Sequence, residues 1–210
     1  MMRDIPGENT PENAQIVIDE TTRLSELVND MLDISKIQSG ARKMRKTVFD
    51  ITETVRGTLS RYEKLTEKDG YKITFEASEN VPVCADRTMM LQVVYNLINN
   101  AVNYTGEDKT VSVVQTLNGK NVRISVTDTG EGISKENLPY IWDRYYKVDK
   151  VHRRAMVGTG LGLSIVKNIL EAHDATYGVE STEGKGSTFW FELPVFEGGN
   201  EASTDTETDK

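Results

Sequence analysis

The segment between residues 87 and 104 most constrains the fold, because it combines a helical apolar pattern with four asparagines. Its apolar residues recur at helical spacing and predict a buried amphipathic helix: Leu91, Val94, Leu97, Ile98, Ala101 and Val102. Asparagine is a mediocre helix former, because its amide competes for backbone groups. Asn96, Asn100 and Asn103 share one face, whereas Asn99 points elsewhere. Since amide oxygens suit Mg²⁺ between phosphates, that face is a candidate ligand site.

Composition limits the class of protein. With 210 residues and 37% hydrophobic content, the chain can form a real core. A net charge of -8, without a long basic run, argues against nucleic acid as the main ligand. The single cysteine, Cys84, cannot form an internal disulfide, which favours a reducing compartment. The sequence shows no apolar stretch approaching ~18 residues and no signal-peptide core, so we expect this segment to be cytoplasmic.

The chain divides into three unequal parts, which we place at residues 1–46, 47–195 and 196–210. The first contains a predicted helix over 12–39, with an apolar stripe that needs partner helices: Val17, Leu24, Leu27, Val28, Met31, Ile34 and Ile37. The second mixes helices and strands. The third is a polar, acidic tail that we expect to be disordered.

The central part is predicted to be an α+β two-layer sandwich, a mixed sheet with helices on one face. Helices are expected at 50–68, at 87–104 and from about Leu161. Strands are expected near 71–76, 82–84, 110–117, 121–128, 176–181 and 187–193. Asn118-Gly119 predicts a hairpin between the expected strands 110–117 and 121–128.

Two glycine-rich segments suggest a nucleotide site. Gly158, Gly160 and Gly162 precede a helix, where backbone N–H groups and the helix dipole can hold phosphate. The same glycines could also form only a tight connection, and no Walker sequence follows. Asp128 ends a predicted strand in "DTGEG", and its carboxylate could accept the amino group of adenine. An ordinary acidic turn is the alternative.

Five motifs occur in an order that resembles the catalytic domain of bacterial sensor histidine kinases: "LQVVYNLINNAVNYT", "DTGEGIS", "IWDRYYKV", "GTGLGLSIVKNI" and "GKGSTFWFELP". The resemblance covers roughly residues 11–194, because "ETTRLSELVNDMLDISKIQSG" resembles the second helix of that family's dimerisation and phosphotransfer hairpin. It implies the α/β sandwich shared with gyrase, mismatch-repair and chaperone ATPases. ATP would lie between the asparagine helix and a mobile lid.

The resemblance also implies site residues. Asn100 corresponds to the magnesium ligand, Asp128 to the adenine-reading aspartate, and Tyr104 to the aromatic residue beside adenine. Thr188 corresponds to a hydroxyl that supports adenine through water. The full expected ATP-binding set is Asn96, Asn100, Asn103, Tyr104, Asp128, Gly130, Gly132, Ile133, Lys147, Gly158, Gly160, Leu161, Gly162 and Thr188.

This family transfers the γ-phosphoryl group of ATP to a histidine, for relay to a response-regulator aspartate, and dimerises through its hairpin helices. Residues 1–46 resemble the end of the first hairpin helix, the loop and the second helix. His152, in the lid, and His173, near a helix end, are poor acceptors. We therefore expect a fragment that binds ATP and Mg²⁺ but cannot phosphorylate itself, with the acceptor and any membrane spans upstream.

Some positions depart from the family pattern. Asn103 stands where a basic residue is common, so a phosphate contact is expected to be lost or supplied by the lid, in which Lys147, Arg153 and Arg154 lie. Aromatic residues stand where phenylalanines are common and are expected to anchor the lid to the core: Trp142, Tyr145 and Tyr146.

Three alternatives remain open. A protein-serine kinase that sequesters a sigma factor shares the ATP fold, although the ending of helix 12–39 favours a histidine kinase. A gyrase-like or repair ATPase would need a following domain that donates a lysine. A nucleotide-binding interaction module without turnover would bind ATP but not hydrolyse it.

Overall fold

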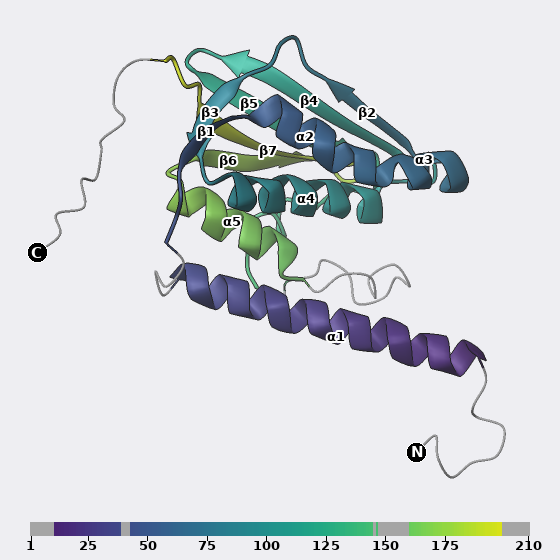
Figure 1. The fold of residues 1–210 in the computed structure, drawn as a ribbon. Helices are drawn as coiled ribbons and strands as arrows, with labels where there is room; N and C mark the ends of the chain where they lie inside the picture. The colour runs from purple at the N-terminus through teal and green to yellow at the C-terminus, as the bar shows by residue number, and fades with distance from the viewer. Residues whose placement is uncertain (1–10, 39–42, 145, 147–159, 199–210) are drawn as a thin grey trace, which may run out of the picture.

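The computed structural model describes residues 11–38, 43–144, 146 and 160–198. Its helices are α1 (Pro11–Gln38), α2 (Ile51–Leu59), the 3₁₀ helix η1 (Ser60–Tyr62), α3 (Glu63–Asp69), α4 (Arg87–Tyr104) and α5 (Gly162–Ala172). Its strands are β1 (Thr47–Asp50), β2 (Lys72–Glu76), β3 (Pro82–Ala85), β4 (Thr110–Asn118), β5 (Asn121–Asp128), β6 (Thr176–Ser181) and β7 (Ser187–Pro194). Figure 1 shows α2, α4 and α5 packed on one face of the sheet.

The main sheet has five strands in the order β2-β4-β5-β7-β6. β2 and β4 are parallel, and the other neighbours are antiparallel. The expected two-layer sandwich with a mixed sheet is therefore confirmed. Asp128 at the end of β5 lies opposite Ser187 at the start of β7, so their side chains share one face of the sheet.

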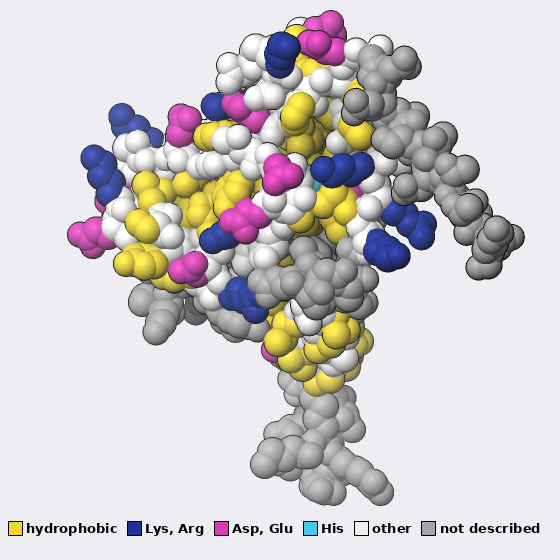
Figure 2. Space-filling model, turned by 90° about the vertical axis from the view of Figure 1, so that its left-hand side faces the viewer, with side chains coloured by type: hydrophobic (Ala, Val, Ile, Leu, Met, Phe, Trp, Pro, Cys, Tyr) yellow, Lys and Arg dark blue, Asp and Glu magenta, His cyan; other side chains and the backbone are white. Residues whose placement is uncertain are grey.

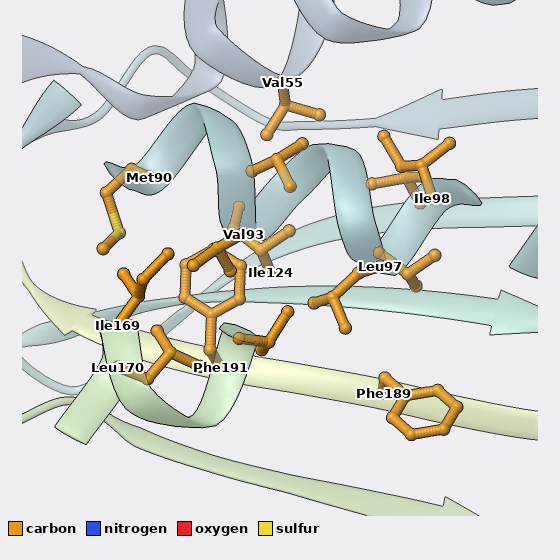
Figure 3. Packing of buried hydrophobic residues seen from close by; sticks show 14 of the residues in the cluster. Val55, Met90, Val93, Leu97, Ile98, Ile124, Ile169, Leu170, Phe189 and Phe191 are labelled. Atoms are coloured by element: carbon orange, nitrogen blue, oxygen red, sulfur yellow. The ribbon is translucent and has the colours of Figure 1, made fainter. Parts of the chain in front are cut away.

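The hydrophobic core lies between this sheet and its helices. Of the apolar residues predicted for α4, five are buried in the core: Val94, Leu97, Ile98, Ala101 and Val102. Leu91 is only half-buried, and Met90 and Val93, which the prediction left out, are buried as well. In Figure 3, Phe191 of β7 points from the sheet toward α4 and α5. This packing fixes α4 and α5 relative to each other and to the end of β5.

The start of α4 is set by Asp86. The Asp86 carboxylate accepts hydrogen bonds from the backbone N–H groups of Thr88 (3.0 Å) and Met89 (3.1 Å). Asp86 is therefore the N-cap of α4, because these first-turn N–H groups have no partner within the helix. The helix covers Arg87–Tyr104, the predicted range. The predicted hairpin is also confirmed, although Asn118 pairs with Asn121 and the loop itself is Gly119-Lys120.

Two local predictions were wrong. The sequence indicated no strand at 47–50, yet β1 pairs with β3 in a separate two-stranded sheet. Asp50 is the last residue of that short strand and also the N-cap of α2, where it accepts the Thr52 N–H at 2.8 Å. Because the helix begins directly after the strand, the helical pattern hides the strand in the sequence. The predicted helix 50–68 is interrupted by η1, which places the Tyr62 ring in the core.

Figure 2 looks onto the end of the molecule where β1 and β3 lie and shows apolar side chains at the surface there. Val48 and Cys84 are exposed partners in the β1–β3 ladder. Phe196 follows β7 and donates its N–H to the Pro82 carbonyl at 2.8 Å, which ties the end of the sheet to β3.

Helix α1 lies alongside α5 (Figure 1). Of its predicted apolar stripe, Leu27 packs against the core. Val17, Leu24, Val28 and Met31 remain about half exposed, and the side chains of two further stripe residues lie outside the description: Ile34 and Ile37. The helix therefore presents apolar surface that its contact with α5 leaves uncovered. Among the described helices, none has the length and apolar content to cross a membrane.

The sheet face away from the helices is mostly polar. Its largest feature is Trp190 of β7, whose ring lies beneath the Arg123 guanidinium at 3.9 Å. Arg123 also donates to Glu192 at 2.6 Å. A β-carbon at Gly178 would lie 2.6 Å from the indole, so glycine at that position leaves room for the ring.

Candidate functional site

The asparagines of α4 lie on a partly exposed face, beside its buried face. Asn96 donates through Nδ2 to the Gln92 carbonyl at 2.9 Å, and its Oδ1 faces the start of α5. A β-carbon at Gly162 would lie 3.1 Å from that oxygen. Within the described part of the chain, the side chains of Asn100 and Asn103 make no hydrogen bond. Their amides are therefore available to a ligand.

The N-terminus of α5 lacks the side-chain cap that α2 and α4 have. Leu161 occupies the N-cap position and is fully buried, whereas aspartates occupy it in α2 and α4. Gly160, just before it, has a φ of 73°, which favours glycine. A helix start whose N-cap residue makes no side-chain cap can present first-turn N–H groups and a positive dipole end to an anion. The other two loop residues of the expected set, Lys147 and Gly158, lie outside the described residues.

Asp128 occupies the end of β5 and is only 2% exposed. Its Oδ1 accepts the backbone N–H of Gly130 at 2.9 Å. Burial raises the pKa of the Asp128 carboxyl, while the N–H groups of Gly130 and Ser187 act in the opposite direction. A buried carboxylate at a strand end, held by backbone N–H groups, is a directional acceptor and not an exposed acidic turn.

The glycines after Asp128 allow close backbone contacts. A β-carbon at Gly130 would lie 1.9 Å from the Tyr104 carbonyl oxygen, and one at Gly132 would lie 2.2 Å from the Thr182 carbonyl oxygen. The turn is thereby pressed against the end of α4 on one side and the β6–β7 connection on the other. Tyr104 itself is 47% exposed, and its backbone carbonyl is the group that meets this turn.

Ile133 joins this turn to β6. Its N–H donates to the Ser181 hydroxyl at 2.8 Å, and its side chain packs against the core. Ser181 in turn lies 2.9 Å from the Ser187 hydroxyl. The two serines therefore tie Ile133 to the start of β7, next to Asp128.

The structure does not bring Thr188 to the other expected residues. Thr188 lies beside Thr127 on the open face of the sheet, 2.9 Å between hydroxyl oxygens, because side chains alternate along a strand. Ser187, one residue earlier, is buried and pairs with Asp128. The hydroxyl beside Asp128 therefore belongs to Ser187, which sequence reasoning missed. The alternating burial of Ser187, Phe189 and Phe191 could have identified it.

The described residues form two groups along α4. Asn96, Gly160, Leu161 and Gly162 meet where α4 and α5 approach, and the Asp128 turn meets Tyr104 at the end of α4. Because a helix rises about 1.5 Å per residue, Asn96 and Tyr104 lie about 12 Å apart along the axis. Asn100 and Asn103 lie between them.

An aromatic cluster lies against the sheet and includes Trp142, one of the three aromatic residues expected to pack on the core. The Trp142 ring meets Tyr177 and Phe189 edge-on, with centroids 5.0 and 5.8 Å apart. Tyr146 donates through its hydroxyl to Asn137 at 2.6 Å. Trp142 and Tyr146 pack against the core, whereas Tyr145 and the expected lid residues 147–159 lie outside the described residues.

The arrangement defines an α/β sandwich with a candidate ligand site along α4. A family described as the histidine kinase-, DNA gyrase B-, and HSP90-like ATPase matches residues 85–197, and the chain belongs to this ATPase family. The sensor-like histidine kinase SenX3 of Mycobacterium bovis is 34% identical over 189 residues, covering 90% of this chain and 46% of SenX3. The chain thus spans about half the length of that curated relative.

Two solved structures extend the likeness. Full-length ShkA in complex with AMPPNP has a TM-score of 0.73 and 28% identity, covering 90% of this chain and 40% of ShkA. The histidine kinase ThkA, in complex with the response regulator protein TrrA, has a TM-score of 0.72 and 28% identity, covering 91% of this chain and 52% of that chain. The resemblance to sensor histidine kinases is confirmed, and the serine-kinase, gyrase-like and inactive-module alternatives are not favoured.

Proposed function

We propose that the chain binds ATP with Mg²⁺ between α4 and α5 and supplies the catalytic part of a sensor histidine kinase. In the intact protein, the γ-phosphoryl group would pass to a histidine and then to an aspartate of a response regulator. The observation that carries this proposal is the buried Asp128 carboxylate, whose turn contacts the Tyr104 carbonyl at the end of α4. The asparagines of α4 lie between this turn and the start of α5, where Leu161 makes no side-chain cap.

The residues present fit a nucleotide. Asp128 could accept the amino group of adenine, with Ser187 rather than Thr188 as the neighbouring hydroxyl. The N–H groups at the start of α5 fit the phosphates, with Asn96 beside Gly162. Gly130, Gly132 and Ile133 would shape the turn under the base, and Lys147 and Gly158 stay candidates from sequence.

The Asn100 amide would hold a magnesium ion, because its oxygen suits that ion and the side chain has no hydrogen-bond partner among the described residues. When bound, the ion would supply charge neutralisation for the phosphates. Asn103 lies further along the same face, towards Tyr104, so we propose that it contacts the nucleotide and does not ligate the ion.

We place the phosphoacceptor outside this chain. His173 is buried, and both of its ring nitrogens are within hydrogen-bond distance of backbone groups, so it cannot receive a phosphoryl group without disrupting the fold. His152 lies outside the described residues. The chain alone would then bind ATP without becoming phosphorylated on histidine.

The partners follow from the same proposal. The half-exposed apolar stripe of α1 suits the helix of a second copy and supports dimerisation through hairpin helices. ThkA was solved with a response regulator, which supports a response regulator as the partner of this chain. A cytoplasmic location of this chain is consistent with its single cysteine, and any membrane anchoring would come from other segments.

Calorimetry tests this proposal directly. The chain should bind ATP in the presence of Mg²⁺ more tightly than in its absence, and more tightly than GTP. Hydrolysis and binding are measured separately, since an inactive module would bind without turnover. Absence of ATP binding at millimolar nucleotide would overturn the assignment of a nucleotide site.

A further inference from the structure

The segment after α4 and the turn after β5 cross at very short range. A β-carbon at Gly130 would lie 1.9 Å from the Tyr104 carbonyl oxygen, and one at Gly106 would lie 2.7 Å from the Thr129 carbonyl oxygen. Each segment thus carries a glycine where the carbonyl of the other approaches. We call this contact between residues 104–110 and 128–130 the turn crossing.

A chain of polar side chains closes the turn crossing. The Thr129 hydroxyl donates to the Asp108 carboxylate at 2.5 Å and lies 3.0 Å from the Thr105 hydroxyl. Thr105 can donate to the Thr110 carbonyl at 2.8 Å. Thr105 is buried, whereas Asp108 and Thr129 are exposed. The polar chain therefore runs from the buried end of α4 to the surface of the turn.

The Asp108 carboxylate is in the form that can accept this bond. The Thr129 hydroxyl, then the hydroxyl and backbone of Thr110 and the charge of Lys72, hold the pKa of the Asp108 carboxyl below its usual range. At neutral pH it is ionised, and a hydrogen bond to a charged acceptor is stronger than one between neutral groups.

The turn crossing includes the two residues that follow Asp128. Thr129 lies between Asp128 and Gly130 in the chain, and Gly130 donates its N–H to Asp128 Oδ1. We infer that Asp108 and Thr129 are positioning residues that hold the Asp128–Gly130 turn against the end of α4, and so set the selectivity of the site for the adenine base. This inference rests on the proposed nucleotide site. The only side-chain hydrogen bonds of Asp108 and Thr129 among the described residues lie within the turn crossing.

Two Thr129 variants separate the hydroxyl from the shape of the side chain. Thr129→Val removes the donor with little change in volume, and Thr129→Ser keeps it. Calorimetry with ADP and GDP, both with Mg²⁺, should show roughly three- to tenfold weaker ADP binding for Thr129→Val, with a smaller ADP-to-GDP preference. Thr129→Ser should stay within about twofold of the parent. Thr116→Val, on the open face of β4, is the matched control.

The ADP-to-GDP preference distinguishes positioning from general destabilisation. Loss of folded protein weakens both nucleotides equally and leaves their ratio unchanged, whereas a displaced Asp128 weakens ADP more. The amide resonance of Gly130 should also shift more in Thr129→Val than in Thr129→Ser, because a change beyond the neighbour effect reports on the bond to Asp128.

A second pair of variants applies if Thr129→Val does not fold. Asp108→Ala removes the exposed acceptor and should lower the ADP-to-GDP preference, while Glu107→Ala, an exposed neighbour, should not. Unchanged ADP affinity and unchanged preference in Thr129→Val and Asp108→Ala would overturn the inference while leaving the nucleotide site intact. A parent chain that does not bind ADP would overturn both.

Discussion

The imidazole of His173 accepts the backbone N–H of Asp86 at Nε2, 3.0 Å away, while Nδ1 lies 2.8 Å from the Ile169 carbonyl. Because a carbonyl can only accept, Nδ1 carries the proton and the ring is neutral. Asp86 caps α4 and His173 ends α5, so one ring joins the start of one site helix to the end of the other.

This geometry predicts a pH-dependent stability. Burial lowers the pKa of His173 from its usual 6.5, and of the charged groups around it Lys46 lowers the pKa while Asp86 and Asp174 raise it. The unfolded chain therefore binds a proton that the folded chain does not, and stability should fall as the pH drops below about 6.5. Protonation would also remove the lone pair that accepts from Asp86.

Urea unfolding between about pH 5 and about pH 7.5 measures this dependence. His173→Ala should lose roughly 1–3 kcal/mol at neutral pH and show a flatter profile, since Asp86 N–H loses its partner. His152 is present in both proteins and cancels in the comparison. Parallel profiles for parent and variant would show that His173 does not titrate with unfolding.

Asn100→Ala should weaken Mg-ATP binding about tenfold and remove its dependence on Mg²⁺, because the amide oxygen is the proposed metal ligand. The unliganded fold should keep its melting temperature, since the Asn100 side chain bonds to no other described residue. Calorimetry with and without Mg²⁺ gives the result, with Asn99→Ala on the same helix as control. Equal Mg-ATP affinity in Asn100→Ala and the parent would exclude the metal-ligand role.

Asp128→Asn should weaken ADP by roughly 1–3 kcal/mol, because the amide can present a donor to the amino group of adenine and leave both unpaired. Glu131→Gln makes the same change of charge in an exposed residue of the same turn and should have little effect. Titration calorimetry with ADP compares them. Similar affinities for both variants would make Asp128 a structural residue of the turn.

Tyr62→Phe should stabilise the fold by about 1 kcal/mol. The Tyr62 hydroxyl is buried with no hydrogen-bond partner among the described residues, and the side chain is only 6% exposed. Tyr177→Phe is the opposite case, because that hydroxyl donates to Glu171 at 3.0 Å. In thermal melts, the melting temperature should rise for Tyr62→Phe and fall for Tyr177→Phe. A lower melting temperature for Tyr62→Phe would reveal a partner for the Tyr62 hydroxyl.

Phosphotransfer should depend on an added acceptor. With radiolabelled ATP and Mg²⁺, the chain alone should gain no acid-labile label, and a protein carrying the acceptor-histidine helix should become labelled when mixed with it. The rate should be below that of a covalently joined kinase, because the effective concentration is lost. Acid-labile label mapped to His152 or His173 would contradict the placement of the acceptor outside this chain.

Much of the fold could be predicted from local patterns. The bounds of α4 follow from its apolar repeat and from Asp86 as a cap, and the β4–β5 hairpin follows from a glycine between two alternating segments. β1 could not be predicted, because its four residues are stabilised by pairing with β3, which is remote in sequence. Such pairing leaves little local signal.

The site shows the same division. The Asp128 turn, Tyr104 and the start of α5 were expected as site residues and lie along α4, whereas Thr188 is separated from them by strand parity. A shift of one residue in a strand moves a side chain to the other face. Motif resemblance assigned the hydroxyl to Thr188, whereas the alternation along β7 and its register against β5 put Ser187 on the face of Asp128.

The two tryptophans of the chain lie on opposite faces of one strand. Trp142 contacts Phe189 on the helix side, next to the segment that follows the Asp128 turn, and Trp190 lies under Arg123 on the open side. Their fluorescence therefore comes from two separate environments. Replacing Trp190 with phenylalanine would leave Trp142 as the single tryptophan, which can be excited selectively over the eight tyrosines, so ligand-dependent changes at the border of the site could be followed optically without attaching a dye.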